Sequence, residues 1–170
     1  MIRKGYQISF VLIVSLLFLS VNGSFAQTGK VIKSFNAPGG YCTGLTFDGQ
    51  NLWVADRKSD KIYKLDSETG NVLQTIESPA YYPTGLTWDG RSLWNSDIRG
   101  TSDISENLDG KIFQVDPETG IILKTLKSPA TSPRGIAWDG KYLWCVDEKK
   151  DIVIQLSTLD GATINSFPSP

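Results

Sequence analysis

The segment 85–97 reads GLTWDGRSLWNSD, and two other parts of the chain repeat it in related form. Residues 44–56 read GLTFDGQNLWVAD, and residues 135–147 read GIAWDGKYLWCVD. Each copy consists of two short apolar runs joined by Asp-Gly. This dipeptide favours a tight hairpin turn, because glycine adopts a positive φ without steric cost. The sequence therefore predicts three β-hairpins in tandem.

A second pair of strands is expected after each hairpin. Residues 61–66, KIYKLD, alternate in the manner of a half-buried strand, and 71–76, NVLQTI, return after a turn that contains glycine. The same pattern follows the other two hairpins, and repeats of about 40–50 residues with four strands are typical of propeller blades. We predict an all-β fold, a β-propeller of four-stranded antiparallel blades. The expected blades are residues 41–79, 80–129 and 130–170.

The N-terminal part of the repeat region matches the end of a blade. Residues 28–38, TGKVIKSFNAP, align with residues 69–79, TGNVLQTIESP, almost position by position. This match predicts an orphan outer strand over 28–38, so that one chain holds three blades plus one extra N-terminal strand and an incomplete ring. Two interpretations remain open. The chain is either a truncated piece of a longer propeller or one half of a homodimer that completes a ring.

The first 26 residues have the pattern of a signal peptide. Arg3 and Lys4 precede an apolar run over 8–21, and small residues stand before a cleavage point after Ala26. An uncleaved N-terminal anchor is the alternative. We expect cleavage, a folded domain over 27–170, export to the periplasm or the extracellular space, and no membrane association after cleavage.

Composition excludes several classes of function. The chain carries 17 basic and 18 acidic residues, and no basic cluster lies outside the predicted signal peptide, so nucleic acid is not an expected partner. It has no histidine, which excludes zinc sites built on histidine, Ser-His-Asp triads and Cys-His pairs. Cys42 and Cys145 occupy non-equivalent positions in the repeats, so we expect two free thiols rather than a disulfide.

Candidate ligand-binding residues gather at one end of the predicted blades. The connections that lead into first strands and out of second strands share the face of a propeller that usually binds ligands. An inward set of carboxylates with one arginine there suits a polar ligand or a divalent cation. The structural alternative is that each repeated Asp accepts backbone N–H bonds in its own turn. The candidates on these connections are Thr43, Asp56, Thr84, Asp97, Arg134, Asp147 and Glu148.

One loop breaks the repeat. Residues 98–110 form a connection of 13 residues where the first blade has four. The loop adds Asp103, Glu106 and Asp109 to the ligand-binding candidates. Oxygen-bearing side chains at alternating positions suggest a calcium site with Asp97, Asp103 and Asp109 as ligands, although no flanking helices are expected. A solvated loop is the alternative.

The repeats resemble known propeller families. The segments PTGLTWDGRSLW, at 83–94, and KIYKLDSETGNVL, at 61–73, resemble the blades of NHL-type, streptogramin-lyase-like and gluconolactonase-like propellers and of glutaminyl-peptide cyclotransferases. The resemblance covers 28–170 and implies a propeller fold. It is shared by all of these families and does not separate them.

The enzymatic members of these families carry residues that this chain lacks. The resemblance to streptogramin lyases implies a catalytic histidine, which this chain lacks. The resemblance to gluconolactonases implies a metal-binding Asn before the glycine of a first strand, where this chain has Thr43, Thr84 and Arg134. The cyclotransferase opening Phe-Thr-Gln-Gly-Leu corresponds to YCTGL at 41–45, without the Gln. We therefore expect a non-catalytic module that binds a protein or glycan-like ligand. The alternative is an incomplete enzyme module of the cyclotransferase or gluconolactonase type.

Overall fold

The computed structural model describes residues 29–98 and 110–169. The predicted signal peptide and the candidates Asp103, Glu106 and Asp109 lie outside these residues. The described part contains only strands as regular structure, which confirms the all-β prediction. The strands are β1 (Cys42–Phe47), β2 (Asn51–Asp56), β3 (Lys61–Asp66), β4 (Val72–Glu77), β5 (Pro83–Trp88), β6 (Leu93–Asp97), β7 (Lys111–Val115), β8 (Ile122–Lys127), β9 (Pro133–Trp138), β10 (Leu143–Asp147), β11 (Ile152–Leu156) and β12 (Thr163–Pro168).

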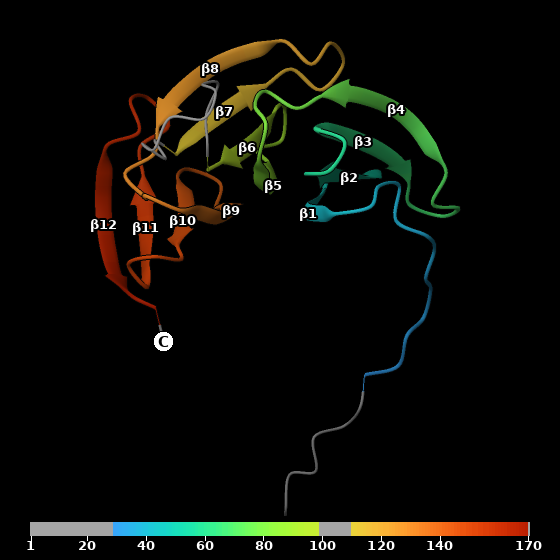
Figure 1. Cartoon of the computed structure of the whole chain (residues 1–170), viewed down its shortest axis with the longest axis horizontal. Coiled ribbons are helices and arrows are strands. Elements are labelled where there is room, and N and C mark those ends of the chain that lie inside the picture. Colours follow the sequence, from blue (N-terminus) through green and yellow to red (C-terminus); the bar gives the residue numbers. More distant parts are fainter. Residues whose placement is uncertain (1–28, 99–109, 170) are drawn as a thin grey trace, which may run out of the picture. The chain divides into compact units, whose positions relative to one another are not determined.

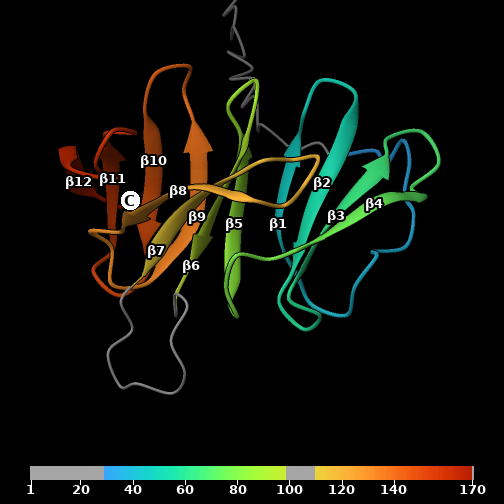
Figure 2. The same ribbon diagram turned by 90° about the horizontal axis from the view of Figure 1, so that it is seen from above.

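The strands form three four-stranded antiparallel sheets in chain order. We call β1–β4 the first sheet, β5–β8 the second sheet and β9–β12 the third sheet. In each sheet the strands run from inner to outer, and β5 lies between β1 and β9 (Figure 1). Figure 2 shows the three sheets side by side, with the connections of each sheet at its two ends. The four-strand unit predicted from the repeats is thus confirmed.

The Asp-Gly turns have the predicted geometry. Gly90 has φ = 97°, and its equivalents Gly49 and Gly140 have φ of 100° and 98°. The Asp of each turn also binds a tryptophan of the following strand: the indole N–H of Trp94 donates to Oδ2 of Asp89 at 2.7 Å. One carboxylate therefore fixes both the turn and the second strand, which explains why Asp and Trp recur together.

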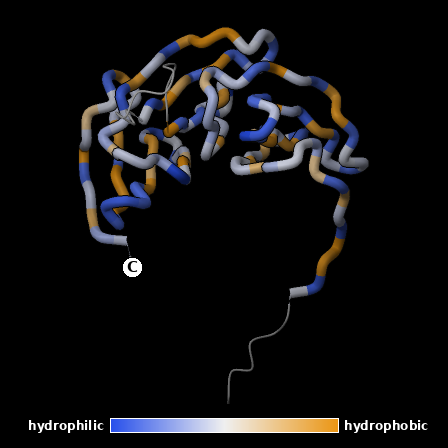
Figure 3. Tube along the Cα trace, viewed as in Figure 1, coloured by the Kyte–Doolittle hydropathy of each residue, from blue (hydrophilic) through white to orange (hydrophobic). Residues whose placement is uncertain are grey.

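The hydrophobic core lies between the sheets. One cluster joins the first and second sheets, around Trp53 and Phe113, and another joins the second and third sheets, around Trp94 and Leu143. Figure 3 shows hydrophobic stretches within the strands, separated by more hydrophilic ones. The recurrent aromatic residues therefore pack sheet against sheet.

The predicted orphan strand over 28–38 is unpaired in its described part, 29–38. Residues 29–38 have no strand assignment. A strand needs a neighbour for its backbone N–H and C=O groups, and each of the three described sheets already has its outer strand in β4, β8 or β12. The three sheets do not close into a ring within residues 34–98 and 110–169 (Figure 1).

The chain divides into two units at residues 33 and 34. The described residues of the first unit, 29–33, are irregular, and the second unit holds all three sheets. Across residues 29–98 and 110–169 we find no helix of the length and hydropathy that a membrane crossing needs.

Candidate functional site

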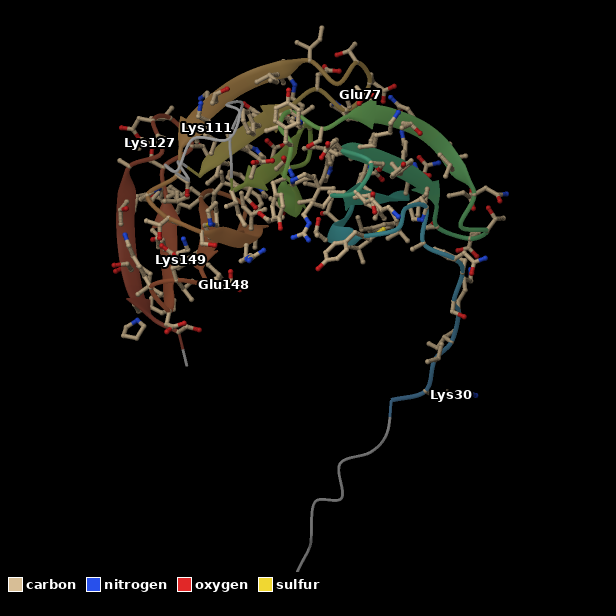
Figure 4. All side chains as sticks on the ribbon, in the orientation of Figure 1. Lys30, Glu77, Lys111, Lys127, Glu148 and Lys149 are labelled. Carbon is tan, nitrogen blue, oxygen red and sulfur yellow. The ribbon has the colours of Figure 1, made fainter. Side chains whose placement is uncertain are left out.

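The end of the sheets where second strands finish and first strands begin carries most of the candidate residues; we call it the loop face. Three equivalent backbone bonds hold it together, from Arg57, Ile98 and Glu148 to the carbonyls of residues 41, 82 and 132. Figure 4 labels Glu148 and Lys149, which follow β10 on this face. The loop face is therefore built by the same contact in all three sheets.

The carboxylate of Asp56 is used inside the fold. Its side chain is fully buried and accepts bonds from the backbone N–H groups of Tyr41, Lys58 and Ser59 and from the Ser59 hydroxyl. Burial alone would raise the pKa of Asp56, but these donors outweigh it and lower that pKa. Asp56 therefore stays ionised as the cap of two connections.

Asp97 and Asp147 occupy the same position and are also fully buried. Asp97 accepts the backbone N–H of Tyr82 at 2.7 Å. Asp147 accepts the backbone N–H of Thr131 at 2.8 Å and that of Lys149 at 3.0 Å. Burial raises the pKa of Asp147, and the bonds from Thr131 and Lys149 more than reverse this effect. These bonds are the ones expected from the structural alternative for the repeated Asp.

Thr43 and Thr84 connect neighbouring sheets rather than facing solvent alone. The Thr43 hydroxyl donates to the carbonyl of Pro83 at 2.8 Å, and the Thr84 hydroxyl donates to that of Pro133 at 2.6 Å. With Arg134 and Gly135 they line a hollow of about 310 Å³. This hollow brings together one candidate residue from each sheet.

Arg134, the residue of the third sheet that is equivalent to Thr43 and Thr84, forms an ion pair. Arg134 Nε lies 2.5 Å from Oε2 of Glu148, and both side chains are partly exposed. The hydrogen bond from Arg134, and then its positive charge, lower the pKa of Glu148. The structure therefore brings Arg134 and Glu148 together, as a pair that a ligand can reach.

Sequence reasoning missed an aromatic and cationic cluster on the same face. The guanidinium carbon of Arg57 lies 4.0 Å from the ring centroids of both Tyr41 and Tyr82. Tyr41 is 53% exposed. The signal was present in the sequence, since a tyrosine precedes the first strand in two repeats and Arg57 is not repeated. Such a stacked arginine is held in place and presents donors to solvent.

The described residues show no gathering of three His, Cys, Asp or Glu side chains that could hold a metal ion. Because Asp103 and Asp109 lie outside those residues, the calcium site with Asp97 stays a prediction. Cys42 and Cys145 are both free, as expected from their positions. Burial, and to a lesser extent Asp147, raises the pKa of Cys145 to about 12, so this thiol is a poor nucleophile.

No family model and no curated protein matches the sequence. Solved structures are similar to it. Myxococcus xanthus glutaminyl cyclase aligns with a TM-score of 0.62 and 11% identity, over 75% of this chain and 53% of that chain. BamB from Moraxella catarrhalis aligns with a TM-score of 0.51 and 17% identity, over 75% of this chain and 37% of that chain. The computationally designed Ika4 protein aligns with a TM-score of 0.57 and 15% identity, over 84% of this chain and 81% of that chain.

These similarities establish the fold. Glutaminyl cyclase and BamB are β-propellers, and 75% of this chain aligns with each of them. Together with the three four-stranded sheets, this shows the fold of an incomplete β-propeller. The chain spans about half of the glutaminyl cyclase and a smaller share of BamB. At such low identities the likeness shows the fold alone.

Proposed function

We propose that this chain is an exported, non-catalytic binding module that uses its loop face to hold a protein or glycan-like ligand. The observation that carries the proposal is the Arg57 guanidinium, stacked between Tyr41 and Tyr82 on that face. Arginine and tyrosine are the residue types that contribute most to binding energy at protein interfaces, and aromatic rings also stack on ligands.

The state of the acids supports binding over catalysis. Asp56 and Asp147 hold their carboxylates in backbone bonds, and Glu148 is paired with Arg134. A general acid or base needs an atom that can donate or accept a proton within reach of a substrate. The described residues of the loop face offer donors from Arg57 and Arg134 more readily than free carboxylates.

Site-specific crosslinking tests for a protein partner. A photo-reactive residue in place of exposed Lys58, on the loop face, should crosslink to a partner in the exporting cell. The same residue in place of Gln50, in the Asp-Gly turn at the opposite end of the first sheet, is the control. Equal crosslinking from both positions would count against the loop face.

An oligosaccharide array tests for a glycan ligand. Binding should be lost in Arg57→Ala and kept in Arg91→Ala, which removes an exposed arginine from an Asp-Gly turn. If neither a crosslinked partner nor an array signal depends on the loop face, the proposal fails.

The alternative function is enzymatic, and the similarity to a glutaminyl cyclase is the observation that favours it. The alternative predicts turnover of Gln-initiated peptides or of sugar lactones, with or without calcium. The binding module predicts none. Turnover that is lost in Arg57→Ala would overturn the non-catalytic assignment.

A further inference from the structure

The sheets pack on one another through two faces that recur along the chain. We call the side of a sheet that points to the next sheet in the chain its forward face, and the opposite side its rear face. Forward faces bury Trp53, Ala55, Ile62 and Ile76 in the first sheet and Trp94, Ser96, Ile112 and Leu126 in the second. Rear faces bury Leu86, Leu93, Phe113 and Val115 in the second sheet and Leu143, Cys145, Ile154 and Leu156 in the third.

The forward face of the third sheet has the residues of an interface without a neighbour among the described sheets. Strand register places Trp144, Val146, Val153 and Phe167 at the positions of Trp94, Ser96, Ile112 and Leu126. Leu126 is 4% exposed, whereas Phe167 is 44% exposed. The Trp144 and Phe167 rings contact each other, with centroids 5.9 Å apart. This face is thus an apolar surface of the kind that the other two sheets bury.

The rear face of the first sheet is the complementary surface. Leu45 and Phe47 take the positions of Leu86 and Trp88 in the second sheet but are 64% and 52% exposed. They stand on the same face as Leu52, Val54 and Leu65, of which Val54 and Leu65 are buried. Part of this face forms an apolar hollow of about 300 Å³, which residues 35–38 of the N-terminal segment also line. One chain therefore carries both halves of a further sheet-to-sheet interface.

The glycine that starts the three repeated segments gives an independent indication. A Cβ added to Gly85 would lie 2.5 Å from the carbonyl oxygen of Arg134, and one added to Gly44 would lie 2.9 Å from the backbone N of Leu86. Each glycine is required because the first strand of the next sheet approaches it. Gly135 stands at the same position, yet an added Cβ meets only a methyl group of Val146 at 4.0 Å. The third sheet therefore has a glycine at this position although no described backbone approaches it.

Polar contacts between sheets repeat in the same way. Gln74 of β4 donates to the carbonyl of Pro117 at 3.0 Å, and Lys124 of β8 donates to the carbonyl of Thr158 at 2.9 Å. Asn165 of β12 is the equivalent donor by register. The equivalent acceptor in the first sheet is the carbonyl of Ser67.

We propose that a second copy of this chain covers both faces, with the forward face of each third sheet packed on the rear face of the other copy's first sheet. A two-fold axis then makes both new interfaces identical. Two copies of three sheets give a ring of six sheets, within the usual range of about 4–8 blades. The inference concerns the sides of the sheets and is independent of any ligand on the loop face.

A residue of the N-terminal segment, Phe35, occupies a position on the first sheet that the second copy would have to fill. Gly120 is in contact with Ile76 and Gly161 with Leu126, each the buried residue of the preceding outer strand. On the first sheet, Phe35 covers the equivalent Gly70. The sequence around it, IKSFNAP at 32–38, matches INSFPSP at 164–170 in four of seven positions. Closure of the ring therefore requires Phe167 of the second copy to replace Phe35 over Gly70.

Sedimentation of the purified chain over a concentration series tests the proposal. We expect a reversible monomer–dimer equilibrium. Gly135→Val should abolish the dimer and leave the far-ultraviolet circular dichroism of the monomer unchanged, since the added side chain enters open space in one copy. Val146→Asp should have the same effect, while Leu123→Asp, at a 53% exposed position on the outer strand of the second sheet, serves as the control.

Phe35→Asp tests the exchange at Gly70. Emptying this position should strengthen association by roughly tenfold, the change that about 1.4 kcal/mol produces. Weaker association in this variant would overturn the exchange. A chain that stays monomeric up to high micromolar concentrations would overturn the dimer and would assign the faces to sheets encoded beyond residue 170 or to another protein. A dimer whose dissociation constant changes in neither Gly135→Val nor Val146→Asp would also overturn the proposed interface.

Discussion

The second and third sheets repeat the same strand pattern, with tryptophans at equivalent positions, but their surroundings differ. Trp94 of the second sheet is 2% exposed because the third sheet covers it, whereas Trp144 of the third sheet remains partly exposed. Both indoles donate to the Asp of their own Asp-Gly turn at 2.7 Å. The difference shows that the repeat determines the strand pattern within a sheet, while the neighbouring sheet determines how much each side chain stabilises the fold.

The largest expected effect comes from the two tryptophans. Trp94→Ala should lower the free energy of unfolding by about 3–5 kcal/mol, because it removes a buried side chain and leaves a cavity. Trp144→Ala should cost less than half as much, since its ring buries less area in one copy. Urea unfolding followed by circular dichroism, at concentrations where the chain is monomeric, measures both. Equal losses would contradict the comparison.

The equivalent glycines give a smaller contrast. Gly85→Ala should cost about 1–3 kcal/mol, because its Cβ overlaps the backbone of the third sheet. Gly135→Ala should change stability by no more than about 0.5 kcal/mol, as expected for an open surface position. The same unfolding experiment compares them. A costly Gly135→Ala in the monomer would show that a local requirement of β9, and not a neighbouring sheet, explains this glycine.

Much of the fold was predictable from the sequence because its signals are local. Asp-Gly turns, strand alternation and the repeated tryptophans are each encoded within a few residues, and the structure confirms the hairpins and four-strand units. The described part of the strand expected over 28–38 is unpaired for a non-local reason. Its sequence suits an outer strand, but hydrogen bonding requires a partner strand that the three described sheets do not provide.

The candidate site was predictable only in part. The repeated Asp residues lie on the loop face as expected, since turn chemistry is local. The stack of Arg57 between Tyr41 and Tyr82 joins two connections that are 41 residues apart in sequence and touch because the first and second sheets pack together. Such a contact depends on the angle between sheets, which the pattern of residues does not encode.

The reactivity of the two thiols tests how firmly the second sheet packs on the third. Cys145 is 1% exposed against the second sheet, whereas Cys42 is exposed. At pH 8 a disulfide reagent should modify one thiol per native chain, and the second only as fast as the third sheet separates from the second. Mass spectrometry of modified peptides identifies the residue, and Cys42→Ser is the control. Rapid modification of Cys145 in the native chain would show that this interface opens easily.

The smallest expected effect compares two Asp residues that share an unusual backbone conformation. Asp60 and Asp151 precede β3 and β11 with φ of 53° and 51°, a conformation that Asn also tolerates. Among the described residues, no hydrogen-bond donor reaches the buried Oδ1 of Asp60. Burial, followed by the charges of Asp56 and Glu77, raises the pKa of Asp60. Asp151 is exposed, and Pro168, which pairs with Ile152, stands where Glu77 pairs with Lys61 in the first sheet.

A raised carboxyl pKa means that the folded chain binds the proton more tightly than the unfolded chain does. The ionised Asp60 therefore destabilises the fold at neutral pH, and this penalty disappears as the pH falls through the raised pKa toward the ordinary value of about 4. Asp60→Asn should increase the free energy of unfolding at pH 7 by up to about 1 kcal/mol, with the gain fading in acid. Asp151→Asn should change little at either pH. Thermal unfolding at pH 7 and pH 4 measures the four values, and a loss of stability in Asp60→Asn at pH 7 would show that the Asp60 carboxylate has a stabilising partner in the native chain.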